Sequence, residues 1–136
     1  MKGRKRHLLV DTVGLVHGLV VHAAHLSERA GAQRLLAQAG QPGRGLPRLE
    51  RLWCDGGYEG LPQWAAAHCL FAVEMVERPA GTKGWVSLPK RWVVERTLAW
   101  LQRCRRLVRD YEYLPASSKA WIYLAMTGLM LRRLEP

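Results

Sequence analysis

The sequence has few acidic residues, few cysteines and no long apolar run. Its 136 residues hold 11 Asp and Glu against 21 Lys and Arg, for a formal net charge of +10, and most of the bases are Arg. Such a chain is attracted to polyanions, because planar guanidinium groups match the geometry of phosphate oxygens. The charge balance therefore predicts a polyanionic partner.

The cysteines and the apolar segments argue against two further classes of protein. Cys54, Cys69 and Cys104 are odd in number and lack CxxC spacing, which argues against a disulfide framework or a zinc knuckle and fits a reducing cytoplasm. The longest nearly unbroken apolar stretch, residues 120–131, is about 12 residues long, whereas a membrane span needs about 20. Asp11 and His17 interrupt the apolar residues that follow the basic start, so residues 1–6 are interpreted as a basic arm that leads into a strand. No membrane association is expected.

The residue pattern predicts one small α/β domain over residues 1–136. Apolar residues make up 49% of the chain and charged residues 24%, which is close to the globular average. Strands and helices alternate along the chain, as is typical of an α/β sandwich. The expected elements are a two-stranded hairpin that turns at Val13 and Gly14 and is covered on both faces, strands over about 49–54 and 71–77, helices over about 28–39, 61–69, 91–109 and from Ser117 or Ser118 to 133, and loops at 40–47 and 79–89.

Asp55 is the first candidate site residue. It ends an apolar strand and is followed by two glycines. In open α/β sheets, ligands collect at the carboxyl ends of the strands, where such a carboxylate faces a crevice. An Asp before Gly-Gly is also a common turn former. Its position alone leaves both interpretations open.

Glu95 is the second candidate. On the predicted helix it shares one face with Arg91, Gln102 and Arg106. A carboxylate beside arginines can be an ordinary salt-bridged surface residue. With a second carboxylate such as Asp55 nearby, it can instead form part of a two-metal site for phosphoryl transfer.

Basic residues concentrate in two segments. The segment 90–109 holds seven bases and one acid, and positive charge in its second half suits the carboxyl-terminal end of a helix. The net charge of the whole chain favours phosphate contact over a merely solvated helix face. The candidate DNA-binding residues are Arg91, Arg96, Arg103, Arg105, Arg106 and Arg109 on the helix, and Lys2, Arg4, Lys5 and Arg6 in the amino-terminal arm.

Four segments that together cover nearly the whole chain resemble one protein family. They are KGRKRHLLVDTVGLVHGLVVHAA, RLWCDGGYEG, LPKRWVVERTLAWLQRCRRLVRDYEYL and SSKAWIYLAMTGLMLRRL. The chain resembles the carboxyl-terminal part of the catalytic domain of bacterial insertion-sequence transposases of the DDE type, in the insertion-sequence-five group. The motifs W-x-D-G-G-Y and R-W-V-V-E-R-T are the specific part of the resemblance.

The resemblance implies an RNase H-like α/β fold, with a mixed sheet flanked by helices, that lacks its first strand. It also implies DNA strand cleavage and joining with two Mg²⁺ or Mn²⁺ ions. The family's second acidic ligand falls on Asp55 and its final one on Glu95, which are therefore the implied catalytic and metal-binding residues. The family's helix signature Y-x2-R-x3-E-x6-K keeps Arg91 and Glu95, whereas Leu88 replaces its Tyr and Gln102 replaces its Lys.

The family's first catalytic Asp has no counterpart here, because it lies on a strand upstream of the segment that matches residues 2–12. Asp11, on the following strand, is not a substitute. The expected protein binds DNA, both transposon ends and target, but is inactive alone; its partner is a second copy or an amino-terminal transposase portion from a frameshifted upstream reading frame. The resemblance implies a bacterial cytoplasmic, nucleoid-associated location. Two alternatives stay open: a non-catalytic DNA-binding regulatory product or decayed remnant of the same element, and an unrelated small basic RNA-associated protein.

Overall fold

The computed structural model of the protein describes residues 3–40, 46–84 and 90–134. Its elements, in chain order, are β1 (Arg4–Val10), β2 (Val16–Ala23), α1 (Glu28–Ala39), β3 (Arg51–Cys54), the 3-10 turn η1 (Gly56–Tyr58), α2 (Leu61–His68), β4 (Ala72–Met75), α3 (Arg91–Gln102), α4 (Arg105–Val108) and α5 (Pro115–Leu134). The mixture of strands and helices confirms the predicted α/β class. Within the predicted loops, residues 41–45 and 85–89, Leu88 among them, lie outside the described residues.

β1 and β2 form the predicted hairpin and pair antiparallel. Asp11 closes the turn, because its carboxylate accepts hydrogen bonds from the backbone N–H groups of Val13 and Leu15, each at 3.0 Å. Alternate side chains of a strand point to opposite faces. Val20 accordingly packs in the cluster that includes α1, whereas Leu19 packs in the cluster that includes α5. Both faces of the hairpin are covered, as predicted.

β3 and β4 pair in parallel and are connected through η1 and α2. A buried cluster holds this unit together: Leu61 and Ala65 of α2 pack with Val73 of β4 and with Leu36 of α1. The neighbouring residue of α1, Leu35, packs against the hairpin instead. α1 therefore joins the two pairs of strands.

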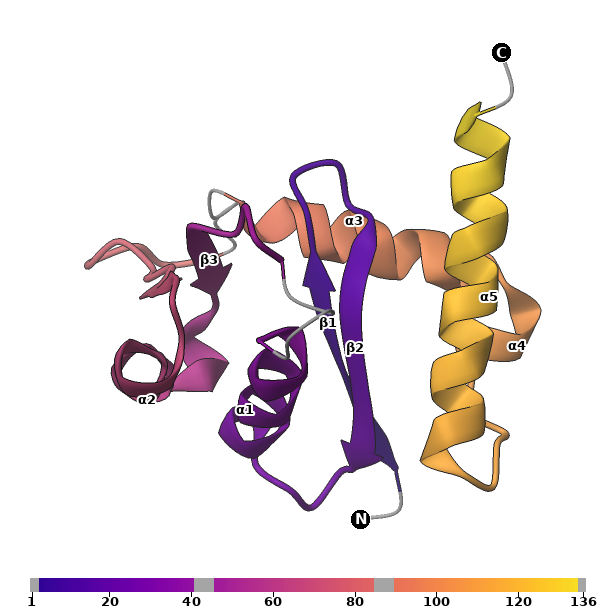
Figure 1. The fold of residues 1–136 in the computed structure, drawn as a ribbon, viewed down its shortest axis with the longest axis horizontal. Helices are drawn as coiled ribbons and strands as arrows, with labels where there is room; N and C mark the ends of the chain where they lie inside the picture. The colour runs from indigo at the N-terminus through magenta and orange to yellow at the C-terminus, as the bar shows by residue number, and fades with distance from the viewer. Residues whose placement is uncertain (1–2, 41–45, 85–89, 135–136) are drawn as a thin grey trace.

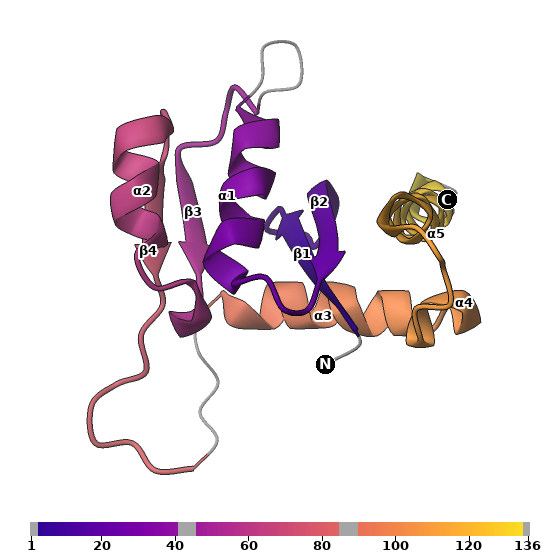
Figure 2. The ribbon, with the colours of Figure 1, turned by 90° about the horizontal axis from the view of Figure 1, so that it is seen from below.

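The four strands form two separate sheets of two strands each, instead of the expected single mixed sheet. Figure 2 shows the strands in the order β4, β3, β1, β2, with α1 packed over the region between β3 and β1, and Figure 1 shows β3, β1 and β2 in the same order. Within the described ranges no strand pairs with the edges of β3 and β1 that face each other. Both edges therefore keep unpaired backbone groups.

α3 runs across the hairpin from the neighbourhood of β3 to α5 (Figure 2). Thr97 in its second half is fully buried, and its hydroxyl donates a hydrogen bond to the carbonyl oxygen of Gly14 at 2.7 Å. Gly14 has a φ of 88°, which favours glycine, and a Cβ atom there would lie 2.8 Å from Oγ1 of Thr97. The hairpin turn therefore fixes the position of α3.

The single helix predicted over 91–109 is wrong, because the chain turns after α3 and resumes as α4. Leu101 and Leu107 are both buried in one cluster with α5. In a continuous helix, a spacing of six residues would place these two side chains about 120° apart. The turn at Cys104, whose backbone is extended, brings both leucines to the same core.

α5 begins at Pro115, so Ser117 and Ser118 lie within its first turn and do not cap it. Proline suits the start of a helix, because the backbone N–H that it lacks has no partner there. The buried Ser118 hydroxyl donates to Asp110 at 2.9 Å instead. One face of α5 packs through Ile122, and the opposite face is exposed. In the described ranges, no helix combines the length and apolarity that crossing a membrane requires.

Candidate functional site

Asp55 follows β3 directly and caps the turn η1. Its Oδ1 accepts a hydrogen bond from the backbone N–H of Gly57 at 3.1 Å, so the predicted turn-forming role is confirmed. Its Oδ2 accepts no hydrogen bond from any residue that the structure describes, and the side chain is half-buried. The turn therefore occupies one carboxylate oxygen and leaves the other available for a ligand.

Tyr58, the last residue of η1, ties this turn to the hairpin through a buried relay. The carbonyl oxygen of Ala23 can only accept, so His22 donates to it from Nδ1 at 2.8 Å. Nε2 of His22 then accepts from Nε2–H of His7 at 2.7 Å, and Nδ1 of His7 accepts from the Tyr58 hydroxyl at 2.9 Å. When the donors run from Tyr58 through His7 and His22 to the Ala23 carbonyl, both imidazoles are neutral and each ring nitrogen has a hydrogen-bond partner. At Gly31 of α1, a Cβ atom would overlap both rings, so the close approach of α1 requires glycine.

Two ionisable residues of the Asp55 turn, Cys54 and Tyr58, are electrically neutral at pH 7. Burial raises the pKa of Tyr58 to about 12, and the negative charges of Asp55 and Glu28 add to the effect. Burial likewise raises the pKa of the Cys54 thiol to about 11, again with a contribution from Asp55. Tyr58 is therefore a hydrogen-bond donor in this site, and Cys54 is not a thiolate nucleophile.

Lys90 and Trp53 bring the start of α3 to the end of β3. The ammonium group of Lys90 lies 3.4 Å from the centroid of the Trp53 ring, a cation–π contact between the two elements. Lys90 has a φ of 68°, a left-handed conformation that non-glycine residues adopt at a cost. Trp53 precedes Asp55 by two positions, and the backbone of Asp55 is still extended, so the alternation of side chains favours the same side for both. The first turns of α3 therefore lie beside the end of β3 that carries Asp55 (Figure 2).

Glu95 forms an ion pair with Arg91, with Nε and Oε1 3.0 Å apart. The salt-bridged interpretation of Glu95 is thus confirmed, and about half of each side chain is exposed. Carboxylate oxygens are the donors that Mg²⁺ and Mn²⁺ take, so Asp55 and Glu95 fit such ions in kind. In the three described ranges, however, no group of three or more His, Cys, Asp or Glu side chains is arranged to hold a metal ion. The convergence of Asp55 and Glu95 stays a prediction.

The predicted basic arm is part of a strand, apart from Lys2, which lies outside the described residues. Arg4 pairs with Asp110 at 3.1 Å and donates to a backbone carbonyl. Lys5 donates to the carbonyl oxygen of Leu26, and Arg6 to that of Leu107. These bases tie β1 to neighbouring segments, which the sequence did not indicate.

The arginines after α3 differ in how their charge is balanced. Arg106 pairs with Glu112 at 2.8 Å. Arg103, Arg105 and Arg109 are exposed and form no ion pair with any residue in the described part of the chain. These three arginines are therefore the strongest candidates for the predicted phosphate contacts.

Arg96 lies against two indole rings of its own helix. Its guanidinium carbon is 4.6 Å from the Trp92 centroid and 4.8 Å from the Trp100 centroid. The Nε atom of Arg96 is buried without a hydrogen-bond partner among the residues described. The stacked guanidinium is held in place and keeps unused donor capacity.

The sequence reasoning missed the imidazole relay. Its signal was available in the hairpin, because a turn at Val13 and Gly14 places His22 opposite Lys5. His7 is two positions from Lys5 and so points to the same face as His22. Two histidines on one covered face are then diagonal neighbours and must pair with each other or with α1.

A family model described as "Transposase DDE domain" matches residues 1–130. The matched range includes Asp55, Glu95 and the arginines of α3 and α4. No curated protein and no solved structure matches the chain.

Proposed function

Because the chain belongs to the transposase DDE domain family, we propose that Asp55 and Glu95 are two of the acidic residues with which an insertion-sequence transposase cleaves and joins DNA strands. The observation that carries this proposal is the contact of Lys90 with Trp53, which sets the start of α3 beside the end of β3. The proposal includes assignment to the insertion-sequence-five type and to the carboxyl-terminal part of the catalytic domain.

We further propose that the two sheets belong to one RNase H-like sheet. The facing edges of β1 and β3 support this, since each can pair with another strand. One strand between them would join the antiparallel pair to the parallel pair and would end near Asp55. A third carboxylate on such a strand, from a second copy or from an amino-terminal transposase portion, would complete the ligand set.

The chain's own residues would supply ligand oxygens and hold them in place. Asp55 offers Oδ2 because Gly57 engages Oδ1, and the Tyr58–His7 bond fixes the turn. When bound, divalent ions lower the pKa of the attacking water or 3′-hydroxyl and stabilise the charge on the leaving 3′-oxygen. Arg91 orients Glu95 and can contact phosphate once the carboxylate faces a cation.

DNA is the proposed partner, and the basic residues around α3 and α4 are its proposed contacts. A non-catalytic regulatory product of the same element would keep these residues without the chemistry, whereas membership of the family counts against an unrelated RNA-associated protein. A metal-dependent nicking assay separates the first two possibilities. The assay is run with and without an added amino-terminal transposase portion. The catalytic proposal expects nicking when that portion is added, whereas a regulatory product nicks DNA neither with it nor without it.

The direct test of the two carboxylates is the affinity of the protein for Mn²⁺, measured by water-proton relaxation. We expect Asp55→Asn and Glu95→Gln each to weaken binding about tenfold or more, which is about 1.4 kcal/mol. Glu59→Gln is the matched control, because it removes an exposed carboxylate four residues after Asp55. Equal affinities in all three variants would contradict the assignment.

A further inference from the structure

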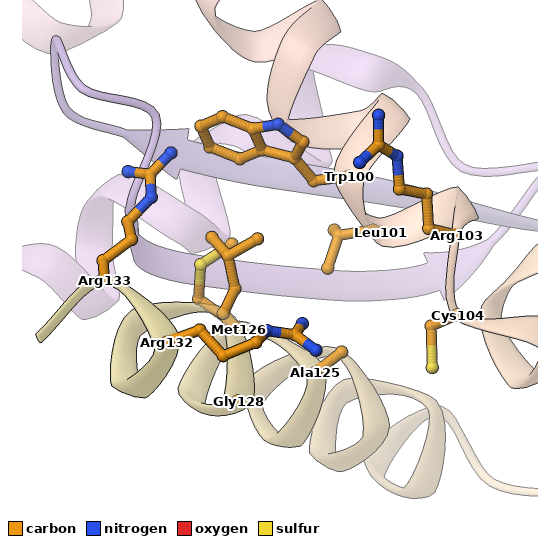
Figure 3. Close-up of a pocket in the computed structure, with 10 residues that line it drawn as sticks. Trp100, Leu101, Arg103, Cys104, Ala125, Met126, Gly128, Arg132 and Arg133 are labelled. Carbon is orange, nitrogen blue, oxygen red and sulfur yellow. The ribbon is translucent and has the colours of Figure 1, made fainter. Parts of the chain in front are cut away.

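A basic groove lies between the carboxyl-terminal end of α3 and the second half of α5, away from the carboxylates (Figure 3). Its volume is about 680 Å³. Residues that line it include Trp100, Leu101 and Arg103 from the end of α3, and Met126, Arg132 and Arg133 from α5. Leu101 and Met126 make an apolar floor, Arg103 and Arg133 stand on opposite sides of it, and Arg132 lies between them on the α5 side.

The charge in this groove is unbalanced. Three arginines line it, and no Asp or Glu stands among the described residues that do so. Arg103, Arg132 and Arg133 also form no ion pair with any residue whose structure is described. Like charges brought together by two helices repel one another until an anion is bound.

Trp100 holds one of these guanidinium groups in place. The guanidinium carbon of Arg133 lies 4.3 Å from the centroid of the Trp100 ring, and that of Arg96 lies 4.8 Å from it. A guanidinium stacked on an indole keeps its N–H donors free at its edges, where they suit the two oxygens of a phosphate. The buried, unpartnered Nε of Arg96 adds to the positive field on the same ring.

We propose that this groove binds the phosphate backbone of duplex DNA, at a site separate from Asp55 and Glu95. The choice of DNA rests on the proposed function, whereas the choice of phosphate rests on the groove itself. Duplex is favoured over single-stranded DNA because arginines already contact the Trp100 ring, the aromatic side chain on which an unpaired base could stack here. The bound backbone would run between α3 and α5.

The test measures the affinity of the full chain for a fluorescent 20-base-pair duplex of arbitrary sequence, and for its single strand, by anisotropy at several salt concentrations. Arg103, Arg132 and Arg133 are changed together to Ala. We expect the affinity for duplex at 0.1 M salt to fall on the order of a hundredfold and the slope of log affinity against log salt to flatten by about 2.7, at 0.9 per lost contact. The matched control changes three other exposed arginines, Arg34, Arg48 and Arg78, to Ala.

A second pair of variants keeps every arginine. A Cβ atom added at Gly128 meets no other atom within 4 Å, so this position in α5 accepts a side chain. Gly128→Glu places an anion in the groove and should weaken duplex binding about tenfold or more, whereas Gly128→Ala should bind normally and fold more stably, since Ala is the better helix former. Three outcomes would overturn the proposal. They are an equal loss of duplex affinity in the matched control, a loss of affinity confined to the single strand, and normal duplex binding by Gly128→Glu. None of these variants touches a Mn²⁺ ligand, so failure here is distinct from failure of the proposed function.

Discussion

α3 carries charge at both ends, and the two ends differ in how it is balanced. At the amino-terminal end Arg91 pairs with Glu95, and Lys90 lies on the ring of Trp53. At the carboxyl-terminal end Arg103 faces Arg132 and Arg133 of α5 without an acidic partner among the described residues. Paired charges leave little net field, whereas unpaired ones attract a polyanion.

Under the proposed function, this difference would correspond to a division of labour along one helix, with metal binding at one end and DNA contact at the other. Arg91 holds the carboxylate of Glu95 near the start of α3, and in the proposed site a metal ion would replace Arg91 as its cationic partner. Arginines without partners gain affinity from any phosphate they meet. The hydrogen bond from Thr97 to the hairpin turn at Gly14 anchors α3 near its middle and so fixes the positions of both ends of the helix.

The largest expected effect comes from removing the core beneath the arginine end. Ile122 is fully buried and packs with Leu101 and Leu107, so Ile122→Ala should cost about 4 kcal/mol of unfolding free energy. Urea denaturation followed by circular dichroism measures this. Leu134→Ala, at a position that is 81% exposed, should change stability by less than about 0.5 kcal/mol. Similar losses in both variants would mean that α5 does not pack on this core.

The next effect concerns the relay that holds the carboxylate end. Burial, together with the neighbouring His22 and Lys5, lowers the pKa of His7 from 6.5 to about 4. The folded state therefore favours neutral His7, and its contribution to stability is complete above pH 6.5 and lost as the pH falls toward 4. The lost stability should be about 3 kcal/mol.

Urea denaturation at a series of pH values measures this loss. His7→Gln should remove most of the pH dependence between pH 6.5 and 4, whereas His25→Gln, at an exposed position, should keep it. Asp11 does not interfere: burial works to raise its pKa, but hydrogen bonds from His17 and the backbone hold it below 3.8, outside this range. A stability profile of His7→Gln that matches the unmodified chain would rule out the neutral relay.

A smaller effect, on DNA affinity, distinguishes the functions of the two ends of α3. Changing Arg103, Arg105 and Arg106 to Ala should weaken DNA binding and flatten the salt slope by about 1.8, at 0.9 per contact, because Arg106 is already engaged by Glu112. Asp55→Asn should leave DNA affinity and slope unchanged, since a metal ligand contributes little to phosphate contact. Salt titrations of both variants check this. An unchanged slope in the triple variant would show that these arginines face away from DNA.

The smallest effect is expected at the ion pair of α3. Arg91→Ala should change the unfolding free energy by less than about 0.5 kcal/mol, because the pair is half-exposed and its basic member comes first, the weaker order along a helix. Thermal melts of Arg91→Ala and Glu95→Gln should therefore lie close together. A large loss in either variant would mean that the pair supports the fold.

Much of the fold was predictable from the sequence, because local pattern determines it. The turn at Gly14, the helix over 28–39 and the strand before Asp55 all occur where the residues indicate. The break between α3 and α4 was not predictable, since the apolar repeat continues through Cys104 and only packing on α5 selects the turn. The division into two sheets was also hidden, because strand pairing depends on neighbours that no local pattern specifies.

The candidate site divides in the same way. Asp55 and Glu95 stand out by residue type and position, and both lie within the range that the family model matches. The hydrogen bond from Gly57 to one oxygen of Asp55 followed from the two glycines after Asp55. Two further contacts were not predictable: Tyr58 bonded to His7, and Lys90 on Trp53. These contacts join residues far apart in the chain, so they depend on the register of the hairpin and on the path of α3.

The most direct test of the central claim is a crystal structure of the protein soaked with Mn²⁺, with the ion located by its anomalous scattering. We expect Mn²⁺ to be bound by Asp55 through Oδ2, with the carboxyl group of Glu95 turned from Arg91 and within about 8 Å of that of Asp55, the span that ligands of one metal pair allow. Mn²⁺ bound elsewhere, or Asp55 and Glu95 on opposite sides of the sheet, would contradict the account.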